Sequence, residues 1–500
     1  MKILIQKKLT AKNGVLIIPV FKEESKKISK IYGKNIDEFI FDRVQGEEFQ
    51  GKRKEVAATY IKGEDFHGKL ILVGVGKLEN YSSNFARRLG AIMAKVLRSQ
   101  KIENLSVYLH PEMLAYAEEL IQGMYFAQYR GDLYKTKKEE KFEYYNIKNL
   151  NLISAIQGQS STGQFSKLNA AVQKATLIAE SDRFVKDLVN GAPNYVDSEY
   201  LAAQAQKIAK DNGCEIKILG QKELEKQKFG GIVAVNRGSS KEAKLIVLKY
   251  FGAKNKKEKP LVIIGKGVVF DSGGYNLKPS GGIETMHLDM AGAAAVLGTF
   301  KILKKLGIKR NIIGITPVVE NMVSANAFKP SEVITMYNGK TVEICNTDAE
   351  GRLILADAIS YGLEMNPEAI ITIATLTGAV AVALGDRYAG LLGNSPKLRR
   401  EIQNSGREVD DLGWPLPLHP DFKDKLDSHI ADMKNRDNPT KNLAGSSKGA
   451  AFLHRFIGDK KWCHIDIGGT AYTSDPLEYQ TIGATAMGLR MLIRFLENQS

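Results

Sequence analysis

The chain has 500 residues, more than the roughly 250–300 at which one hydrophobic core usually stops growing, so we expect two domains. An apolar fraction of 43% and a charged fraction of 25% are typical of globular proteins, and no apolar run reaches the ~18–20 residues of a membrane span. The 71 basic and 56 acidic residues give a net charge of +15. This excess permits nucleic-acid binding, but clusters such as 134–141 and 251–260 are also typical of solvated loops.

The N-terminal stretch MKILIQKKLTAKNG contains only a short apolar run between lysines. It lacks the apolar core and small-residue cleavage site of a secretory signal. The three cysteines, Cys214, Cys345 and Cys463, show no pairing motif, which argues against a disulfide framework. We therefore expect a cytoplasmic protein without membrane attachment.

Short strand patterns alternate with helix patterns over residues 1–160, which indicates a smaller N-terminal α/β domain. The predicted strands cover 2–6, 14–21, 69–76, 104–110 and 149–155, and the predicted helices cover 85–100 and 111–130. A polar segment at 156–169 is the candidate boundary. A long helical pattern follows at 170–191 and ends at Gly191, shortly before Pro193, so 161–194 is predicted as a linker helix region.

From residue 195 to 500 the alternation becomes regular, and continuous Val/Ile-rich runs indicate strands that are buried on both faces. The predicted strands cover 214–220, 231–238, 245–250, 261–270, 311–319 and 369–376, and the predicted helices cover 199–213, 291–307 and 352–365. We expect an α/β fold in which this larger C-terminal domain has a central, mostly parallel sheet flanked by helices. Functional groups of such sheets gather at the carboxyl ends of the strands.

Polar residues interrupt the apolar pattern at two strand ends. Lys266 lies within LVIIGKGVVFDSGG, and Asp271 follows five residues later. A lysine that reaches out into solvent at a strand end would explain Lys266 taken alone, since lysine is almost never buried unless paired. The Walker spacing is absent.

Downstream, NLKPSGGIETMHLDMAGAAAV supplies Lys278 and Asp289. Asp289 precedes a helical start, so an N-terminal helix cap is an alternative to a functional role. No second histidine stands at ligand spacing from His287, which favours a local packing role. His464 and Asp466, in the strand-like WCHIDIGGT, are also interpreted as structural.

The octapeptide NTDAEGRL (346–353) alternates Asp348, Glu350 and Arg352. In an extended chain these three side chains would point to one face. Thr347 and Glu350 also match a capping box ahead of the following helix. A capping box does not require Asp348 or Arg352.

Asp271, Asp289, Asp348 and Glu350, together with the two lysines, form an oxygen-rich group with few histidines or cysteines nearby. Such ligands suit Mg, Mn or carboxylate-bound Zn. Four carboxylates in one pocket would repel one another unless cations neutralised them. Two divalent ions that share carboxylates and a bridging water would meet this need.

On these residues the chain resembles the leucyl aminopeptidases, a family that includes the cytosol aminopeptidases and bacterial aminopeptidase A. NTDAEGRL is similar to the family's signature, and GKGVVFDSGG, MHLDMAGAAA, ENM (320–322), ATLTGA (374–379) and WCHIDIGGTAY support it. The resemblance covers roughly 170–500, so it implies that 195–500 is a dimetal aminopeptidase domain. It implies removal of N-terminal, leucine-like residues from short peptides by a water activated between two metal ions.

The resemblance also implies a role for each site residue. It assigns Lys266, Asp271, Asp289, Asp348 and Glu350 to two divalent ions per subunit, Mn²⁺ or Zn²⁺. It makes Lys278 and Arg352 the catalytic pair, with a bicarbonate ion at Arg352 as proton shuttle. Met286, Thr375 and Gly378 match positions that line the pocket for the first side chain, and a homohexamer is the expected assembly.

Two stretches depart from the family pattern. Tyr275 and Asn276 stand before Lys278 where an aliphatic residue and serine are common, and GATAMGLRM replaces GATGRP. The second departure bears on the wall of the substrate pocket. The alternatives are a DNA-binding regulatory protein that retains the peptidase fold, for which no nucleic-acid-binding motif is found, and a scaffold without activity.

Overall fold

The computed structural model describes residues 1–6, 13–23, 34–45, 48–63, 66–99, 101–136, 147–154, 161–437 and 443–499. The chain forms two compact units. Unit 1 contains Met1–Glu180 and Pro476–Thr481, and unit 2 contains Ser181–Asp475 and Ile482–Ser500. The predicted α/β class with a smaller N-terminal and a larger C-terminal part is confirmed. The predicted boundary segment 156–169 begins outside the described residues.

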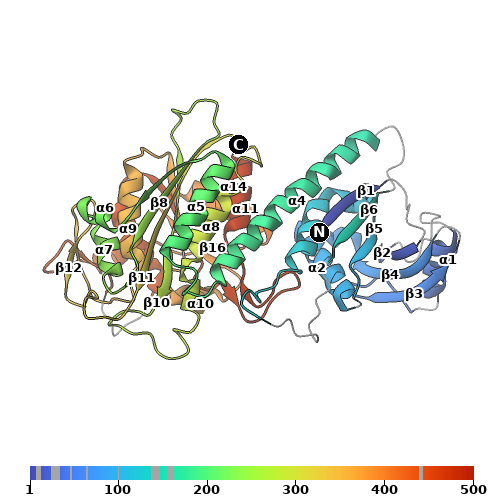
Figure 1. The fold of residues 1–500 in the computed structure, drawn as a ribbon, viewed down its shortest axis with the longest axis horizontal. Helices are drawn as coiled ribbons and strands as arrows, with labels where there is room; N and C mark the ends of the chain where they lie inside the picture. Colours follow the sequence, from blue (N-terminus) through green and yellow to red (C-terminus); the bar gives the residue numbers. More distant parts are fainter. Residues whose placement is uncertain are drawn as a thin grey trace. The chain divides into compact units, whose positions relative to one another are not determined.

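Unit 1 contains a six-stranded sheet in the order β1-β6-β5-β2-β4-β3 (Figure 1). Its strands are β1 (Lys2–Gln6), β2 (Asn13–Phe21), β3 (Val56–Lys62), β4 (His67–Gly76), β5 (Asn104–Leu109) and β6 (Asn149–Ser154). All neighbours are parallel except the edge strand β3, which runs antiparallel to β4. The five predicted strands are present, but β3 was not predicted, because the inner face of VAATYIK offers only one large apolar side chain, Ile61, beside Ala57 and Thr59.

Four helices belong wholly or partly to unit 1: α1 (Lys34–Gln45), α2 (Ser83–Ser99), α3 (Ala117–Phe126) and α4 (Ser161–Val189). Helices α2 and α3 pack closely against each other. A Cβ atom at Gly90 would lie 1.9 Å from the Leu120 carbonyl oxygen, and one at Gly123 would lie 1.8 Å from the Arg87 carbonyl oxygen. Only glycine permits this helix separation at both positions.

The segment Pro476–Thr481 returns to unit 1 from the C-terminal part of the chain. Glu478 holds it in place through ion pairs of 3.5 Å with Arg53, 3.0 Å with Lys54 and 3.7 Å with Arg88. The neighbouring Tyr479 is completely buried and lies 6.3 Å from Phe126, measured between ring centroids.

Unit 2 is built on a nine-stranded sheet in the order β16-β15-β18-β14-β9-β11-β8-β7, with β10 paired to β11. Its strands are β7 (Glu215–Leu219), β8 (Lys244–Phe251), β9 (Leu261–Gly265), β10 (Gly267–Asp271), β11 (Asn311–Asn321), β14 (Ala369–Ala374), β15 (Ala389–Gly393), β16 (Gly413–Pro415) and β18 (Lys461–Asp466). The central strands β18, β14, β9 and β11 are parallel, and antiparallel pairs lie toward the edges. Because the central strands share a direction, Lys266, Thr375, Asp466 and Asn321 meet at one edge.

Helices cover both faces of this sheet. On one face α9 (Gly351–Leu363) contacts both α7 (Gly230–Asn236) and α13 (Gly445–Ile457). On the other face α8 (Ala291–Phe300) contacts α5 (Ser198–Asn212) and α14 (Leu489–Asn498), and α14 contacts α11 (Pro396–Val409). Figure 1 shows α7 and α9 on one side of β8 and β11, with the other group opposite.

Smaller elements complete unit 2. Two minor sheets contain β12 (Val333–Thr335), β13 (Thr341–Glu343) and β17 (Met433–Lys434), and β19 (Tyr472–Thr473) with β20 (Gly483–Ala484). Short helices are α6 (Gln221–Lys226), α10 (Gly378–Leu384), α12 (Asp421–Asp424) and the 3₁₀ helix η5 (Met286–Met290). Unit 1 likewise has the 3₁₀ helices η2 (Leu78–Asn80) and η3 (Pro111–Tyr116).

Two strand predictions are wrong. The run 231–238 is not a strand, because Gly230–Asn236 forms helix α7. A short run that is buried throughout has no periodicity to distinguish helix from strand. The buried Asp357 carboxylate accepts a 3.0 Å hydrogen bond from the Ile232 amide at the start of this helix. The predicted strand 261–270 is in fact two strands, β9 and β10, which are separated at Lys266.

The buried carboxylate of Asp411 accepts hydrogen bonds from amides at the start of the C-terminal helix α14. Asp411 Oδ2 accepts hydrogen bonds of 3.2 Å from the amides of Gly488 and Met491. Its other oxygen pairs with the Arg490 guanidinium, which also lies 3.7 Å from Asp182. The sequence GATAMGLRM, a departure from the family pattern, thus supplies a buried arginine to an ion-pair network.

Over the described residues, none of the helices has the length and apolar character needed to span a membrane.

We predict that Asp411→Ala destabilises unit 2 by about 3–5 kcal/mol, because it removes one partner of a buried ion pair together with a helix cap. Thermal unfolding followed by far-UV circular dichroism measures the effect. Asp424→Ala, at an exposed position, is the matched control. Equal midpoints for the two variants would contradict the role given to Asp411.

Candidate metal centre and substrate pocket

Lys266 lies at the junction of β9 and β10 and is 2% exposed. Its amide donates to the Ile373 carbonyl at 3.0 Å, and its carbonyl accepts from the Ala293 amide at 2.8 Å. Its Nζ lies 2.8 Å from Asp289 Oδ1 and 2.8 Å from Glu350 Oε1, and it donates to the Thr375 carbonyl at 3.0 Å. The alternative of a lysine that reaches into solvent is therefore wrong.

The charges around Lys266 determine its protonation. Burial lowers the pKa of this lysine, but the carboxylates of Asp289, Glu350 and Asp271 outweigh burial and raise the pKa above its ordinary value. Burial raises the pKa of Asp289 to about 6, against the opposing charge of Lys266. For Glu350 the opposite holds, because Lys266 and Lys278 outweigh burial and lower its pKa.

Glycine at position 351 makes room for the Lys266 side chain. A Cβ atom at Gly351 would lie 2.6 Å from Lys266 Cε and 2.7 Å from its Nζ. Carbon atoms do not approach so closely. The glycine of the octapeptide therefore lets the lysine reach Asp289 and Glu350 past the start of helix α9.

A glycine turn after β10 places Asp271 and Lys278 together. Gly273 and Gly274 have positive φ angles of 86° and 65°, which only glycine adopts at little cost. The Gly273 amide donates to Asp271 Oδ1 at 2.9 Å, and Lys278 Nζ lies 2.9 Å from Asp271 Oδ2. Lys278 also pairs with Asp348.

The octapeptide forms a turn rather than an extended chain, so the predicted extended alternation is wrong. The Ala349 amide donates to the Asn346 carbonyl at 3.2 Å, and α9 begins at Gly351. The predicted capping box is also wrong, since Thr347 Oγ1 donates to the Gly273 carbonyl at 2.6 Å and Glu350 pairs with Lys266. The turn nevertheless brings the Asp348 and Glu350 carboxylates together.

Asp289 does not cap a helix, so that alternative is wrong as well. It lies within η5, and the next helix, α8, has no side-chain cap. Its Oδ1 accepts a 2.6 Å hydrogen bond from Thr375 Oγ1, which orients the carboxylate toward Lys266. His464 lies in β18 and bonds to Thr372 Oγ1 at 2.9 Å, in keeping with a structural role.

The acidic cluster has the composition of a metal site. One oxygen each of Asp271, Asp348 and Glu350 lies within 4.8 Å of the others. With Asp289, four carboxylates face two lysine ammonium groups, so the group has a formal net charge of −2 when every carboxylate is ionised. Burial, together with the charge of Glu350, raises the pKa of Asp271 and Asp348. These carboxylates therefore gain stability from added positive charge, and the residues fit divalent cations.

Arg352 is the second residue of α9 and faces a neighbouring loop. Its Nη1 donates to the Asn435 carbonyl at 2.7 Å, while its buried Nε has no hydrogen-bond partner. Burial, aided by the charge of Arg436 and opposed by that of Glu350, lowers the pKa of Arg352 to about 10. The Nε group therefore keeps one donor that no acceptor of the described residues uses.

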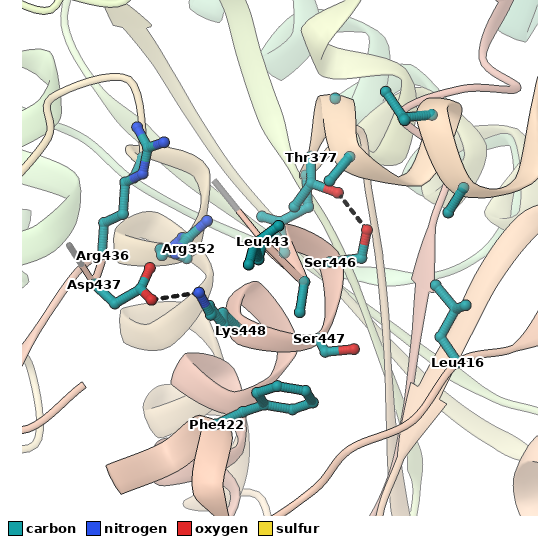
Figure 2. Close-up of a pocket in the computed structure, with 18 of the residues that line it drawn as sticks. Arg352, Thr377, Leu416, Phe422, Arg436, Asp437, Leu443, Ser446, Ser447 and Lys448 are labelled. Carbon is teal, nitrogen blue, oxygen red and sulfur yellow. Dashed lines mark hydrogen bonds and ion pairs between the residues drawn. The ribbon is translucent and has the colours of Figure 1, made fainter. Parts of the chain in front are cut away.

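A pocket of about 710 Å³ opens beside this cluster. Lys278, Asp348 and Arg352 line it, together with Leu376 to Ala379, Leu416, Phe422 and the start of helix α13. Figure 2 shows Arg352, Arg436 and Lys448 on one side of the pocket and Leu416 on the other. Gly378 lines the pocket, whereas the predicted positions Met286 and Thr375 do not: Met286 is half-buried in η5 and Thr375 is buried against Asp289.

Two family models match the chain. The cytosol aminopeptidase family catalytic domain matches residues 183–493, and the N-terminal domain of the same family matches residues 17–138. The chain belongs to the cytosol aminopeptidase family.

Named relatives agree with this assignment. The chain is 36% identical to a probable cytosol aminopeptidase of Syntrophotalea carbinolica, over 96% of this chain and 94% of that protein. It is 35% identical to one of Protochlamydia amoebophila, over 98% and 97%. Among solved structures, the bottromycin maturation enzyme BotP matches with a TM-score of 0.82 and 25% identity, over 97% of this chain and 99% of that one.

Tyr275 and Asn276, which depart from the cytosol aminopeptidase pattern before Lys278, are compatible with the site. The Asn276 amide donates to Thr347 Oγ1 at 2.8 Å, and Asn276 Oδ1 accepts from the Thr347 amide at 2.8 Å. The Tyr275 hydroxyl donates to the Ser324 carbonyl at 3.1 Å. These bonds tie the turn before Lys278 to the octapeptide.

Three polar residues support the site but were not singled out as site residues from the sequence. The Asn321 amide nitrogen donates to Asp271 Oδ1 at 2.8 Å and to the Thr347 carbonyl at 3.0 Å. Asn435 donates to the Asn346 carbonyl at 2.6 Å. Asp466 accepts from Thr377 Oγ1 at 2.7 Å, and Thr377 in turn lies 2.9 Å from Ser446 Oγ. The ENM motif contains Asn321 and the WCHIDIGGT motif contains Asp466, which was interpreted as structural, but nothing marked Asn435.

We predict that Gly351→Ala lowers aminopeptidase kcat/KM by about 10–100-fold, because the added methyl group displaces Lys266 from the acidic cluster. Metal content per chain should fall in the same variant. Activity assays and elemental analysis measure both effects. Gly163→Ala is the matched control, since no atom lies within 4 Å of its added Cβ. Wild-type activity and metal content in Gly351→Ala would contradict the role of this glycine.

Proposed function

We propose that this member of the cytosol aminopeptidase family is a metal-dependent aminopeptidase that removes leucine-like N-terminal residues from short peptides. The main support for this proposal is that four carboxylates and two lysines come together at the edge of the unit 2 sheet, where the cluster opens into a pocket. Such a buried acidic cluster has little structural value of its own, because like charges repel one another.

The residues that would hold two divalent ions, Mn²⁺ or Zn²⁺, are Lys266, Asp271, Asp289, Asp348 and Glu350. When bound, such ions polarise a peptide carbonyl and lower the pKa of a water molecule. Thr375, Asn321 and the Gly273 amide fix the carboxylate oxygens through hydrogen bonds, as outer-shell groups of metal sites do.

Lys278 is suited to stabilise negative charge that develops on a substrate oxygen. Asp271 and Asp348 hold its ammonium group, and it lines the pocket. Burial lowers its pKa, but the charges of Asp271, Glu350 and Asp348 outweigh burial and raise the pKa, so the group stays charged at neutral pH. A fixed positive charge of this kind stabilises an oxyanion.

Arg352 would hold a small anion such as bicarbonate as the proton acceptor. The support is its buried Nε without a partner and its position on the pocket wall. Gly378, which lines the pocket, would contact the first side chain, and Thr375 would orient Asp289.

A homohexamer and a cytoplasmic location complete the proposal, both on family membership alone. Sedimentation velocity on the purified chain tests the assembly. None of the family models and relatives described above supports the DNA-binding alternative.

We predict that removal of metal by a chelator abolishes hydrolysis of leucine amide and that Mn²⁺ or Zn²⁺ restores it. The acidic cluster would keep its negative charge but lose the cations that activate water. Elemental analysis of the active protein should give about two ions per chain. A folded, metal-loaded protein that does not hydrolyse any aminoacyl amide would refute the proposed function.

We predict that Lys278→Met lowers kcat for leucine amide by about 10²–10³-fold, because the fixed charge opposite the developing oxyanion is lost. Circular dichroism and metal analysis separate this effect from unfolding or metal loss. Lys259→Met, at an exposed position, is the matched control. An unchanged kcat in Lys278→Met would contradict the oxyanion-stabilising role given to Lys278.

A further inference from the structure

The carboxylate of Asp466 is fully buried but is not one of the four carboxylates of the acidic cluster. Asp466 is the last residue of β18 and is 0% exposed. Over the described residues, its hydrogen bonds all come from uncharged donors and it forms no ion pair. Burial of such a charge is unfavourable by itself, so its value to the molecule lies in the groups that it holds.

Most of these groups belong to the 375–377 loop, which joins β14 to α10. Asp466 Oδ1 accepts hydrogen bonds from the amides of Leu376, at 3.1 Å, and Thr377, at 3.4 Å. Oδ2 accepts from Thr377 Oγ1 at 2.7 Å. Both Leu376 and Thr377 line the pocket. One buried carboxylate therefore fixes both the backbone and a side chain of a pocket-lining loop.

The turn after Asp466 is shaped to approach this loop. The Gly468 amide donates to Asp466 Oδ1 at 3.2 Å. A Cβ atom at position 468 would lie 2.4 Å from the Thr377 carbonyl oxygen, closer than real Cβ atoms come to backbone. Glycine at this position therefore lets the end of β18 lie directly against the 375–377 loop.

The hydroxyl group of Thr377 extends this contact to a second segment of the pocket. Burial raises the pKa of Asp466 to about 6 against its hydrogen bonds, so the carboxylate is ionised at neutral pH and only accepts. Thr377 must then donate its single hydrogen to Asp466. Its Oγ1 accepts from the Val380 amide at 3.3 Å and from Ser446 Oγ at 2.9 Å. Figure 2 shows Thr377 and Ser446 facing each other at the pocket.

The segments that this chain of hydrogen bonds joins are tightly packed. Ser446 lies in the first turn of α13 and lines the pocket, and a Cβ atom at Gly445 would lie 2.8 Å from Ala379 Cβ of α10. At its other end, the loop is fixed at the acidic cluster, because the Thr375 carbonyl accepts from Lys266 Nζ at 3.0 Å. The loop thus has one anchor at the cluster and a second at Asp466.

We propose that Asp466 is a positioning residue for the substrate, which acts through Thr377 and Ser446 to fix the pocket wall beside the acidic cluster. Gly378, which would contact the first side chain of the peptide, directly follows Thr377. The inference rests on the proposed aminopeptidase function. It adds a residue that governs substrate binding through the loop rather than by contact with the reacting atoms.

The first test is Asp466→Asn, which keeps the shape of the side chain but replaces one acceptor oxygen by a donor. If the asparagine oxygen serves the amides, its nitrogen faces Thr377 Oγ1, so Thr377 can no longer donate there and its bond with Ser446 loses its order. We expect KM for leucine amide to rise about tenfold, with kcat within about threefold of the wild-type value. Steady-state kinetics and elemental analysis of the metal-loaded protein measure this, and metal content per chain should not change.

The second test separates the hydrogen bond of Thr377 from its packing. Thr377→Val keeps the shape but loses the hydroxyl group and should raise KM about tenfold, whereas Thr377→Ser keeps the hydroxyl group and should return KM to within about threefold of wild type. A role in packing alone would give the opposite order. Thr341→Val is the matched control, since Thr341 Oγ1 donates to Asp432 at 3.0 Å outside the pocket.

The double variant Asp466→Asn with Thr377→Val tests whether the two residues act together. Both substitutions break the same hydrogen bond, so the combined rise in KM should be clearly smaller than the product of the two single effects. A rise equal to that product would show independent roles and would overturn the inference.

The remaining outcomes separate this inference from the proposed function. If kcat or metal content falls while KM stays constant, Asp466 acts on the acidic cluster instead, and the inference is overturned. An unchanged KM in both single variants overturns it as well. If Asp466→Asn does not fold, the comparison of Thr377→Val with Thr377→Ser decides alone. If the wild-type protein does not hydrolyse leucine amide, the proposed function fails and the inference fails with it.

Discussion

The ion pairs of the buried Lys266 ammonium group hold together the carboxyl-end edge of the unit 2 sheet, where the acidic cluster lies. Transfer of a charge from water to a protein interior costs several kcal/mol. The carboxylates of Asp289 and Glu350, each with an oxygen 2.8 Å from Lys266 Nζ, offset that cost. The lysine in turn stabilises both carboxylates in their buried positions. One strand end, η5 and the start of α9 thus come together around a single charged atom.

The space for this atom comes from the backbone rather than from side chains. Gly351 leaves the volume that the lysine stem occupies, and Gly273 and Gly274 turn the chain so that Asp271 returns toward the same point. Hydrogen bonds from Thr375 and Asn321 then fix the carboxylate oxygens. A rigid arrangement of this kind suits a site that must hold its geometry during a reaction.

The sequence was sufficient for the general architecture and for the residues of the cluster. Alternating apolar runs gave most strands, and the octapeptide pointed to Asp348 and Glu350. It was insufficient where geometry depends on distant partners. Thr347 bonds to the 273–276 turn instead of capping α9. Residues 230–236 form a helix in which the Ile232 amide donates to Asp357, 125 positions further along the chain. Lys448 and Asn435 carry no local pattern, so the place of Lys448 in the pocket wall and the bond of Asn435 to the Asn346 carbonyl could come only from the fold.

The return of Pro476–Thr481 to unit 1 has a consequence for how the molecule can be divided. The chain passes from unit 2 into unit 1 and back within six residues before it forms α14. Tyr479 is completely buried there, and Glu478 faces three basic side chains. A fragment that starts at Ser181 would keep these residues but lose their surroundings, and would expose an aromatic ring and an acidic group just ahead of its last helix. Each unit therefore consists of two stretches of the chain, and neither can be cut out as one continuous piece of sequence.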